Sequence, residues 1–425
     1  MKYWCVVVIL LFSVRGIAQK KIITTLEFEG LQRTKEVFLR RLVKIKPNSM
    51  LDSLKIETDI ERLNRLPGIA KATYQLREKE LGSYELLYKI EENFTIIPGV
   101  RIATDNNGEF AYRLSLFEFN LLGRNQLIGG FYDNDEFDSY GFFWEAPYLF
   151  SNKLGFGLNF QNNSSQEPVF FPEQTLNYRF QSKAFEGYFT YEFDFHNNAQ
   201  LGLIFSDEEY TFLPELSEGV LPEDKPAFLF SDRITLRGEY EHNNIQIDYQ
   251  YVSGFRSLLD LRFVTGDESN DFLDSFFIGR NDFEYFKRIG ARGNWANRLR
   301  VAFASNSENP FAPFTLDNQL NIRGVGNTVD RGTAAVVLNT EYRHTLYEKG
   351  WFAVQSNAFI DAGTWRNPGE NLSQLVDGSS VKFYSGLGIR FIHKRIFNAV
   401  FRLDYGFGIG ENQTNGLVFG IGQYF

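Results

Sequence analysis

The side chains that most often carry enzyme chemistry are few in this chain and do not form groups. Its four histidines, His196, His242, His344 and His393, are far apart and lack the spacing of metal ligands. No serine stands in a recognisable nucleophile elbow or in a pattern with a histidine. Because Cys5 is the one cysteine, the chain can form no internal disulfide. We therefore expect no enzyme activity, no metal and no cofactor.

Charged residues towards the end of the chain alternate with apolar ones. In one segment Arg402 and Asp404 share a strand face, and the opposite face carries Phe401, Leu403, Tyr405 and Phe407. The segment before it repeats the pattern, with Leu387, Ile389 and Phe391 on the apolar face. One face suits lipid and the other a wet lumen. We expect a lumen-facing network of Gly386, Gly388, Arg390, Arg402 and Asp404, with ordinary lumen lining as the alternative.

The elements that position these residues are strands from 98 to 425. Short segments rich in Phe, Tyr, Leu and Gly alternate in polarity and are separated by clusters of Asn, Asp, Gly, Ser and Glu. At roughly 20 residues per strand and connection, about 16 strands are expected. In a soluble sandwich the apolar faces would turn inward. A transmembrane barrel is favoured because so many segments have one apolar face and because closure satisfies strand edges in lipid.

Composition agrees with this interpretation. Aromatic residues make up 16% of the chain, including 44 Phe and 21 Tyr, while the mean hydropathy is slightly negative. After the start of the chain, no run of about 18 apolar residues could cross a bilayer as a helix. The fold class we expect is therefore mainly β, a transmembrane antiparallel barrel. Segments 164–172 and 214–225 look like Pro-containing polar loops.

The first residues resemble an export signal. Lys2 supplies positive charge, an apolar stretch follows, and Gly16 to Ala18 offers small residues for cleavage. We expect a signal peptide at 1–18, which would also remove Cys5. The expected location is the outer membrane of a Gram-negative bacterium, with outer-membrane lipids as partners and no role for nucleic acid.

Residues 20–93 have the pattern of a small α+β domain in the order β-α-α-β-β. Thr34 can cap a first helix, and Ser49 with Asp52 resembles the capping box of a second one that stops at Pro67. Strands are expected at 72–77 and 84–90, around a turn at Gly82. Between Lys20 and Ile90 there are 15 Lys and Arg against 10 Asp and Glu. This basic balance could attract acidic partners or lipid headgroups, although a solvated charged surface is the plainer interpretation.

Several segments, taken together, carry a family resemblance. In the N-terminal domain they are LEFEGLQRT (26–34), LNRLPGIAKATYQL (63–76) and YELLYKIEE (84–92). In the barrel they are FNLLGRNQL (119–127), WEAPYLF (144–150), NIRGVG (321–326), FIDAG (359–363), GLGIRF (386–391), RLDYG (402–406) and FGIGQYF (419–425). The chain resembles the BamA/TamA/FhaC superfamily, also called the bacterial surface antigen family, with one periplasmic POTRA domain before a 16-stranded barrel.

The resemblance implies roles for particular residues. Ile322, Arg323 and Gly324 would form the tip of a long loop that folds back into the lumen and meets a wall strand carrying Phe359, Asp361 and Gly363. If that strand face is luminal, Asp361 can receive the Arg323 guanidinium in a bidentate pair. Without the resemblance, a solvated Arg323 and a separate polar Asp361 would be the simpler interpretation.

The last two residues, Tyr424 and Phe425, have an implied role as well. In the superfamily a terminal aromatic strand closes the barrel and is recognised by the cell's own insertion machinery. An aromatic position at the membrane interface is the alternative, and both can hold together. We expect the seam to lie between a first strand around 102–116 and a last one around 416–425.

The function implied is assembly or translocation of client polypeptides, such as nascent barrel proteins, with periplasmic accessory proteins as further partners. Capture is expected at a sheet edge of the POTRA domain around 84–90. A polypeptide secretion pore and a lipid-transport or structural barrel that docks another complex are the alternatives. The chain differs from the pattern of the superfamily in having room for a single POTRA domain. It also shows no plug helix before Ile22, which tells against a secretion pore of the FhaC type.

Overall fold

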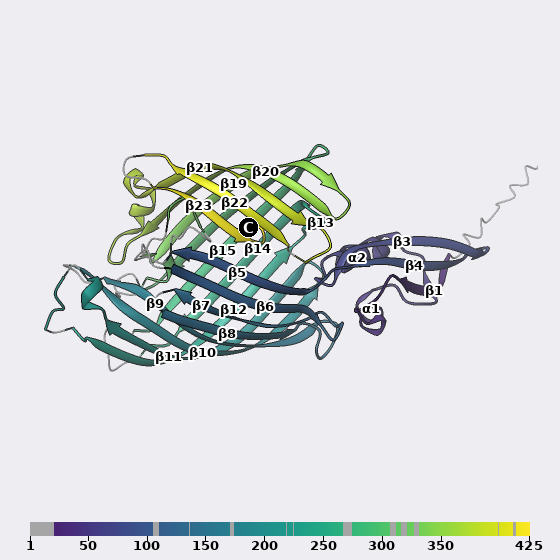
Figure 1. Ribbon diagram of the computed structural model, residues 1–425. Coiled ribbons are helices and arrows are strands. Elements are labelled where there is room, and N and C mark those ends of the chain that lie inside the picture. Colours follow the sequence, from purple (N-terminus) through teal and green to yellow (C-terminus); the bar gives the residue numbers. More distant parts are fainter. Residues whose placement is uncertain are drawn as a thin grey trace, which may run out of the picture.

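The computed structural model consists of a small N-terminal domain attached to one end of a β-barrel (Figure 1). The structure describes residues 21–104, 110–135, 137–170, 174–217, 219–223, 225–266, 274–306, 312–315, 321–326, 331–397, 399–410 and 414–425. The expected signal peptide at 1–18 lies outside the described residues. We call the barrel rim next to the N-terminal domain the domain end and the opposite rim the far end.

The N-terminal domain has four strands and two helices. They are β1 (Ile22–Glu29), α1 (Glu36–Leu42), β2 (Ser49–Met50), α2 (Ser53–Asn64), β3 (Ile69–Glu80) and β4 (Ser83–Glu92). The sheet order is β2-β1-β4-β3, with β1 and β4 parallel. The expected order gains the two-residue strand β2. The expectation of a sheet edge around 84–90 is wrong, because β4 pairs on both sides and β3 forms the edge.

Two local predictions about the helices need correction. Asp52 caps α2 by accepting from the Lys55 amide at 3.2 Å, whereas Ser49 lies in β2. Lys35 is the cap residue of α1, and its side chain makes no capping bond. The Thr34 hydroxyl instead accepts a hydrogen bond from the Asn120 amide of the barrel at 3.0 Å. Thr34 therefore helps to attach the domain to the barrel and does not cap the helix.

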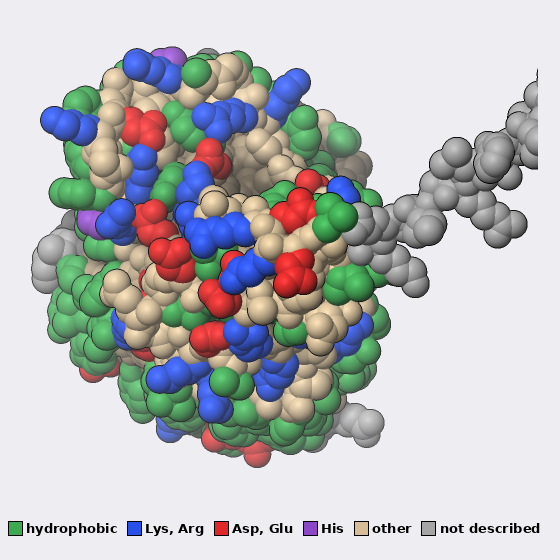
Figure 2. Space-filling model, turned by 90° about the vertical axis from the view of Figure 1, so that its right-hand side faces the viewer, with side chains coloured by type: hydrophobic (Ala, Val, Ile, Leu, Met, Phe, Trp, Pro, Cys, Tyr) green, Lys and Arg blue, Asp and Glu red, His purple; other side chains and the backbone are tan. Residues whose placement is uncertain are grey.

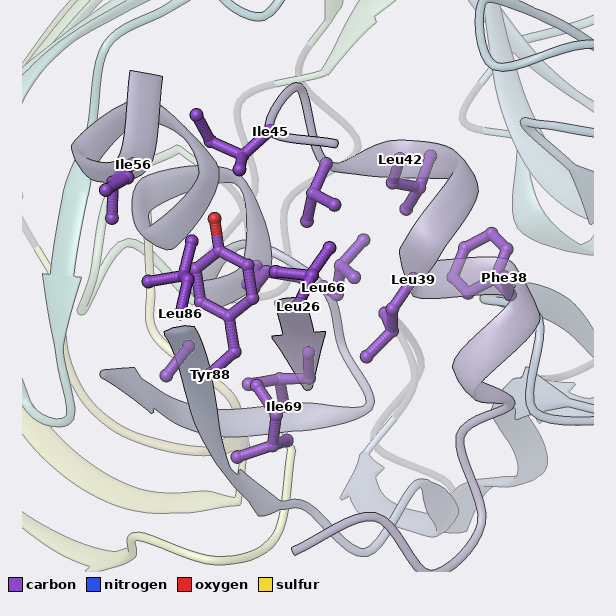
Figure 3. Close-up of a cluster of buried hydrophobic side chains, with 14 of the residues drawn as sticks. Leu26, Phe38, Leu39, Leu42, Ile45, Ile56, Leu66, Ile69, Leu86 and Tyr88 are labelled. Atoms are coloured by element: carbon purple, nitrogen blue, oxygen red, sulfur yellow. The ribbon is translucent and has the colours of Figure 1, made fainter. Parts of the chain in front are cut away.

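The domain has its own hydrophobic core between the helices and the sheet (Figure 3). Leu39 and Leu42 of α1 pack with Ile56 of α2 and with Leu86 of β4. One carboxylate lies inside: Asp59 accepts from the amides of Lys44 and Ile45 and from the Tyr88 hydroxyl, the last at 2.9 Å. Burial, followed by the neighbouring Asp59, raises the pKa of Tyr88 well above its ordinary value. The core residues are Ile23, Leu26, Phe38, Leu39, Leu42, Val43, Ile45, Ile56, Leu63, Leu66, Ile69, Ala72, Leu86, Tyr88 and Ile90.

Sixteen long antiparallel strands form the barrel, as the sequence predicted. They are β5 (Ile96–Thr104), β6 (Phe110–Leu121), β7 (Gln126–Asp135), β8 (Phe137–Ala146), β9 (Leu154–Phe170), β10 (Thr175–Asp194), β11 (Asn197–Phe212), β12 (Phe228–Asn243), β14 (Tyr251–Val264), β15 (Phe276–Ile289), β16 (Gly293–Ala304), β19 (Ala334–Lys349), β20 (Phe352–Arg366), β21 (Lys382–His393), β22 (Val400–Gly408) and β23 (Asn415–Ile421). Shorter elements lie in the connections: β13 (Gln246–Asp248), β17 (Phe314–Thr315), β18 (Arg331–Gly332), η1 (Pro214–Leu216), η3 (Leu372–Val376) and η4 (Gly378–Ser380).

Each long strand pairs with its neighbours along the chain, and β23 lies next to β5 to close the ring. Side chains alternate between the outer face and the lumen, as the period of two requires. On β22, Phe401 and Leu403 are 48% and 40% exposed on the outer face, while Asp404 is 0% exposed inside. The predicted fold class is confirmed. Among the described residues, every helix is too short or too polar to cross a membrane.

The barrel wall has unequal strand lengths around the ring. β10 has 20 residues, while β5 and β23 have nine and seven. One prediction is wrong on the side with the long strands. Residues 164–170 belong to β9 and are not a loop. Pro168 is accommodated there because β8 pairs with β9 only up to Asn162, which leaves that part of β9 paired on one side by β10.

Candidate functional site

A loop segment at 321–326 lies inside the barrel and places Arg323 against the wall. The Arg323 side chain is 0% exposed. Its Nε and Nη2 donate to the two carboxylate oxygens of Asp361 on β20, at 2.8 and 3.0 Å, and its backbone amide donates to the same carboxylate at 3.0 Å. The structure thus brings together the loop arginine and the wall aspartate in a bidentate pair.

A second carboxylate completes the charge balance around Arg323. Glu341 on β19 accepts from Arg323 Nη1 at 2.7 Å and from Arg390 Nη2 at 2.8 Å. Arg343 donates its Nε to the other oxygen of Glu341. All these side chains are at most 1% exposed. One buried carboxylate is therefore shared by three guanidinium groups.

Glu341 and its neighbour Asn339 were missed in the sequence. The Asn339 side chain donates to Asp361 and to the Asn321 carbonyl, both at 2.8 Å, which fixes the start of the loop segment. A signal was present, because Asn339, Glu341 and Arg343 alternate with outward-facing Leu338 and Tyr342. The same alternation test used for the last strands would have found them.

Aromatic rings cover the faces of the Arg323 guanidinium. Its central carbon lies 3.6 Å from the ring centre of Phe359 and 4.4 Å from that of Tyr424. Phe359 is the first residue of the expected wall motif and is buried at 3% exposure. The rings satisfy the flat surface of the cation while carboxylates satisfy its edge.

Glycines allow the loop backbone to touch the wall. A Cβ on Gly406 of β22 would stand 2.2 Å from the Arg323 carbonyl oxygen, and one on Gly324 would stand 2.8 Å from the Gly406 backbone. Gly324 also has φ +96°, a conformation that favours glycine. At the third wall position, a Cβ on Gly363 would meet the Ile322 side chain at 2.8 Å. The loop and the wall are therefore so close together that a side chain at any of these three glycines would push them apart.

The remaining expected lumen residues lie beside this cluster. Asp404 accepts from Asn357 at 2.9 Å and from Arg402 at 3.4 Å, and it lies 3.7 Å from Arg323 Nη1. Arg390 reaches the cluster through Glu341, as described above. Gly386 leaves room for the Phe359 ring, and Gly388 leaves room for the Asp404 carboxylate. The structure therefore joins the expected network to the loop motif.

Tyr424 and Phe425 are not part of the closing strand. β23 ends at Ile421, and Gly422 follows with φ +91°, where the chain turns into the lumen. Gln423 then accepts from Arg390 at 2.9 Å, and the Tyr424 ring lies 4.8 Å from the Arg402 guanidinium. Arg343 donates to the Phe425 carbonyl at 3.2 Å. The expected strand end and the membrane-interface alternative are both wrong here, because these rings pack on buried cations.

The seam between β23 and β5 is bridged at the domain end by another segment. The Phe94 amide donates to the Arg395 carbonyl at 2.9 Å, and the Phe397 amide donates to the Phe94 carbonyl at 3.1 Å. The Phe397 ring lies 4.8 Å from Phe119 of β6. Arg395 also pairs with Glu91 at 2.7 Å. We call residues 94 and 395–397 the rim clasp.

Above the rim clasp the seam is weakly paired. Each of the other neighbouring pairs of long strands has a register of seven or more paired residues, whereas β23 and β5 are neighbours in the ring with no such register among the described residues. The two strands lie side by side in Figure 1. The barrel is closed there with fewer backbone bonds than elsewhere.

The N-terminal domain is docked on several barrel turns at the domain end, which is the end that Figure 2 views. Arg62 of α2 pairs with Glu192 of β10, and Tyr148 of the β8–β9 turn also donates to Glu192. Arg65 donates to the Asn243 carbonyl at 2.8 Å and stacks on Phe195. Burial, and then Glu192, raises the pKa of Tyr148 to about 12. The domain covers part of the opening, and a hollow remains beside it in this view.

The opposite wall of the lumen borders a cavity of about 600 Å³. Arg237 lies there and pairs with Glu186 and Asp260, each at 3.1 Å, and with Glu239 at 2.7 Å. Arg262 pairs with Asp260 at 2.8 Å. The Arg237 and Arg262 side chains are 21% and 37% exposed. This half of the lumen is polar and accessible to water.

In the part of the chain that the structure describes, no three histidine, cysteine or carboxylate side chains come close enough together to hold a metal ion.

The fold and the lumen cluster define an outer-membrane type β-barrel with a POTRA-like N-terminal domain. No family model matches the chain. Among solved structures it is similar to BamA from Haemophilus ducreyi lacking POTRA domains 1–3, with a TM-score of 0.57 and 14% identity over 94% of this chain and 84% of that one. CdiB from Escherichia coli gives a TM-score of 0.60 and 12% identity over 94% and 75%. CdiB from Acinetobacter baumannii gives 0.54 and 11% over 94% and 73%.

At these identities the likeness concerns the fold. The expected architecture is thereby confirmed: one POTRA-like domain followed by a sixteen-stranded barrel with a seam. This architecture is consistent with the bacterial outer membrane.

Proposed function

We propose that this protein assembles or inserts client polypeptides at the barrel seam in the outer membrane of a Gram-negative bacterium. The domain end then faces the periplasm and the far end faces the cell surface. The observation that carries this proposal is the seam itself, where β23 and β5 meet without a continuous ladder. No enzyme activity or cofactor is part of the proposal.

The energetics of a strand edge in lipid favour client pairing at this seam. An unsatisfied backbone group in the hydrocarbon region costs several kcal/mol. Opening the seam exposes the edges of β5 and β23, and a client strand that pairs with either one satisfies those groups again. Because β23 has seven residues, few bonds must separate before a client can enter.

The rim clasp indicates which way the seam opens. It holds the base of β5 to the β21–β22 turn through two backbone hydrogen bonds at the periplasmic rim. The cell-surface end of the seam has no comparable bridge among the described residues. The proposed opening therefore starts at the cell surface, with the rim clasp as its hinge.

Client capture in the periplasm is assigned to the β3 edge. A segment that adds to this edge gains main-chain hydrogen bonds whatever its sequence. Lys71, near the start of β3, pairs with Asp248 of the barrel at 3.2 Å, so this edge begins at the barrel rim. A captured segment would already lie close to the barrel.

Site-specific photo-crosslinking in intact cells tests the proposal. A crosslinking amino acid replaces Val100 of β5 or Leu417 of β23, which are 49% and 59% exposed at the seam. Matched controls are Leu203 and Leu236, which are 44% and 47% exposed on the opposite wall. We expect adducts with newly made outer-membrane barrels at the seam positions and not at the controls. Equal labelling at all four positions, or none with polypeptides, would contradict the proposal.

One observation favours polypeptide secretion as a second candidate. The cavity of about 600 Å³ leaves space along one wall, although the 321–326 segment fills the other side. A crosslinker at Thr235, which lines this cavity, would then trap one large exported polypeptide while the seam positions stay unlabelled. Adducts with envelope complexes through the N-terminal domain alone would instead support a lipid-transport or structural role.

A further inference from the structure

A groove of about 830 Å³ lies between α1 of the N-terminal domain and the β6–β7 turn of the barrel. Its walls come from the two parts of the molecule, and a backbone bond from the Lys35 amide to the Gly123 carbonyl, 2.9 Å long, joins them at its base. The side chains that matter for binding are Arg33, Lys35, Val37, Arg41, Leu122 and Arg124.

The charge of the groove is one-sided. Four of its lining residues are Lys or Arg, and no Asp or Glu is among the lining residues. Arg33 pairs with Glu118 at 2.8 Å, and Arg41 donates to the Tyr148 carbonyl at 2.6 Å. Lys35 and Arg124 are exposed, and neither side chain has an ion-pair partner among the described residues. Two cations therefore stay available for an anion.

Apolar side chains stand next to these cations. Val37 is 81% exposed and Leu122 is 66% exposed. Leu122 keeps this position although its φ of +57° is unusual for a leucine. On the next turn of the same rim, Leu149 and Phe150 are also exposed. Cations beside exposed aliphatic groups suit a ligand that is charged at one end and apolar at the other.

The groove also lies at the level where the lipid-facing surface ends. The outward positions of β6 run from Leu114 and Leu116, both exposed and apolar, to Glu118. Glu118 is the residue that pairs with Arg33 of the groove. The apolar wall thus changes to charge directly above the groove, as at a membrane headgroup layer.

We infer that this groove binds the phosphate headgroup of an anionic phospholipid in the periplasmic leaflet. Lys35 and Arg124 contact the phosphate, and Val37 and Leu122 contact the glycerol and the first methylenes. The bound lipid bridges α1 and the β6–β7 turn and so helps to hold the domain on the barrel. The inference uses the orientation proposed above and does not depend on any client.

Lipid titration of the full, folded chain tests this assignment. In detergent micelles, native mass spectrometry compares phosphatidylglycerol with phosphatidylcholine of the same acyl chains. For Lys35→Gln with Arg124→Gln we expect about tenfold weaker phosphatidylglycerol binding. The matched control, Lys44→Gln with Arg77→Gln, removes two charges elsewhere on the same domain and should bind like the wild type. Val37→Ser should weaken binding severalfold without changing the charge.

Three outcomes would overturn the inference. The first is wild-type phosphatidylglycerol affinity in the Lys35/Arg124 double variant. The second is equal affinity for the two lipids, which would indicate apolar contact alone. The third is displacement of phosphatidylglycerol by inorganic phosphate at millimolar concentration, which would indicate a soluble anion. Because the crosslinking experiment at the seam does not involve this groove, failure of either test leaves the other proposal standing.

Discussion

The two sides of the lumen carry the same kinds of charged residues in different surroundings. On the β19–β22 side, the 321–326 segment covers the wall, and its Arg323 is fully buried together with Asp361 and Glu341. On the β10–β15 side, Arg237 and Arg262 form similar pairs at the edge of a cavity. Buried pairs depend on exact partners because water cannot replace them, whereas hydrated pairs are individually weak. The comparison teaches that the loop, and not the wall, excludes water from the charged residues of one side.

Among the substitutions that test this contrast, removal of Arg323 should cause the largest loss of unfolding free energy. Arg323→Ala leaves Asp361 and Glu341 short of a buried partner, and we expect a loss of about 3–5 kcal/mol in unfolding free energy. Urea unfolding of the purified barrel, followed by the mobility shift between boiled and unboiled samples, measures it. Arg262→Ala on the cavity side is the matched control and should cost about 1 kcal/mol or less. Similar losses in the two variants would remove the distinction between the walls.

A methyl group between loop and wall should have an intermediate effect. In Gly406→Ala the new Cβ would stand 2.2 Å from the Arg323 carbonyl oxygen, so the loop must move. We expect a loss of about 1–3 kcal/mol in the same assay. Gly416→Ala is the control on the neighbouring strand, because its Cβ would have no neighbour closer than 3.5 Å. If both variants unfold like the wild type, the loop does not rest on β22.

The smallest effect is expected on the cavity side. Arg237→Gln removes a cation that has three acidic neighbours, but its side chain is 21% exposed at the edge of the cavity and Asp260 keeps its pair with Arg262. We expect a change of about 1 kcal/mol or less that shrinks further in 0.5 M salt. The loss in Arg323→Ala should hardly respond to salt. A loss for Arg237→Gln that exceeds the Arg323→Ala loss would reverse the comparison.

Alternation along single strands was enough to predict the barrel and the inward face of its last strands. Arg402 and Asp404 were assigned to the lumen because the side-chain period of a strand is two. The same rule applied to β19 places Glu341 on the inward face as well. No local pattern could pair Arg323 with Asp361, since 38 residues separate them; that prediction came from the family resemblance.

Long-range pairing and chain reversals account for the predictions that were wrong. The β4 strand looked like a sheet edge because its parallel partner β1 lies about 60 residues earlier, and local pattern carries no trace of such a pairing. Tyr424 and Phe425 extend an alternating segment, so they appeared to continue it. The reversal at Gly422 is set by buried arginines that accept the rings, and this is visible only in three dimensions.

The short tail after β23 has a thermodynamic consequence. Gln423 and Tyr424 contact Arg390 and Arg323, so moving β23 outward must withdraw these residues from the buried cluster. By linkage, release of Arg323 from the wall and displacement of β23 favour each other by the same coupling free energy. The last residues of the chain therefore couple the position of the loop to the position of the closing strand, so that each one stabilises the other.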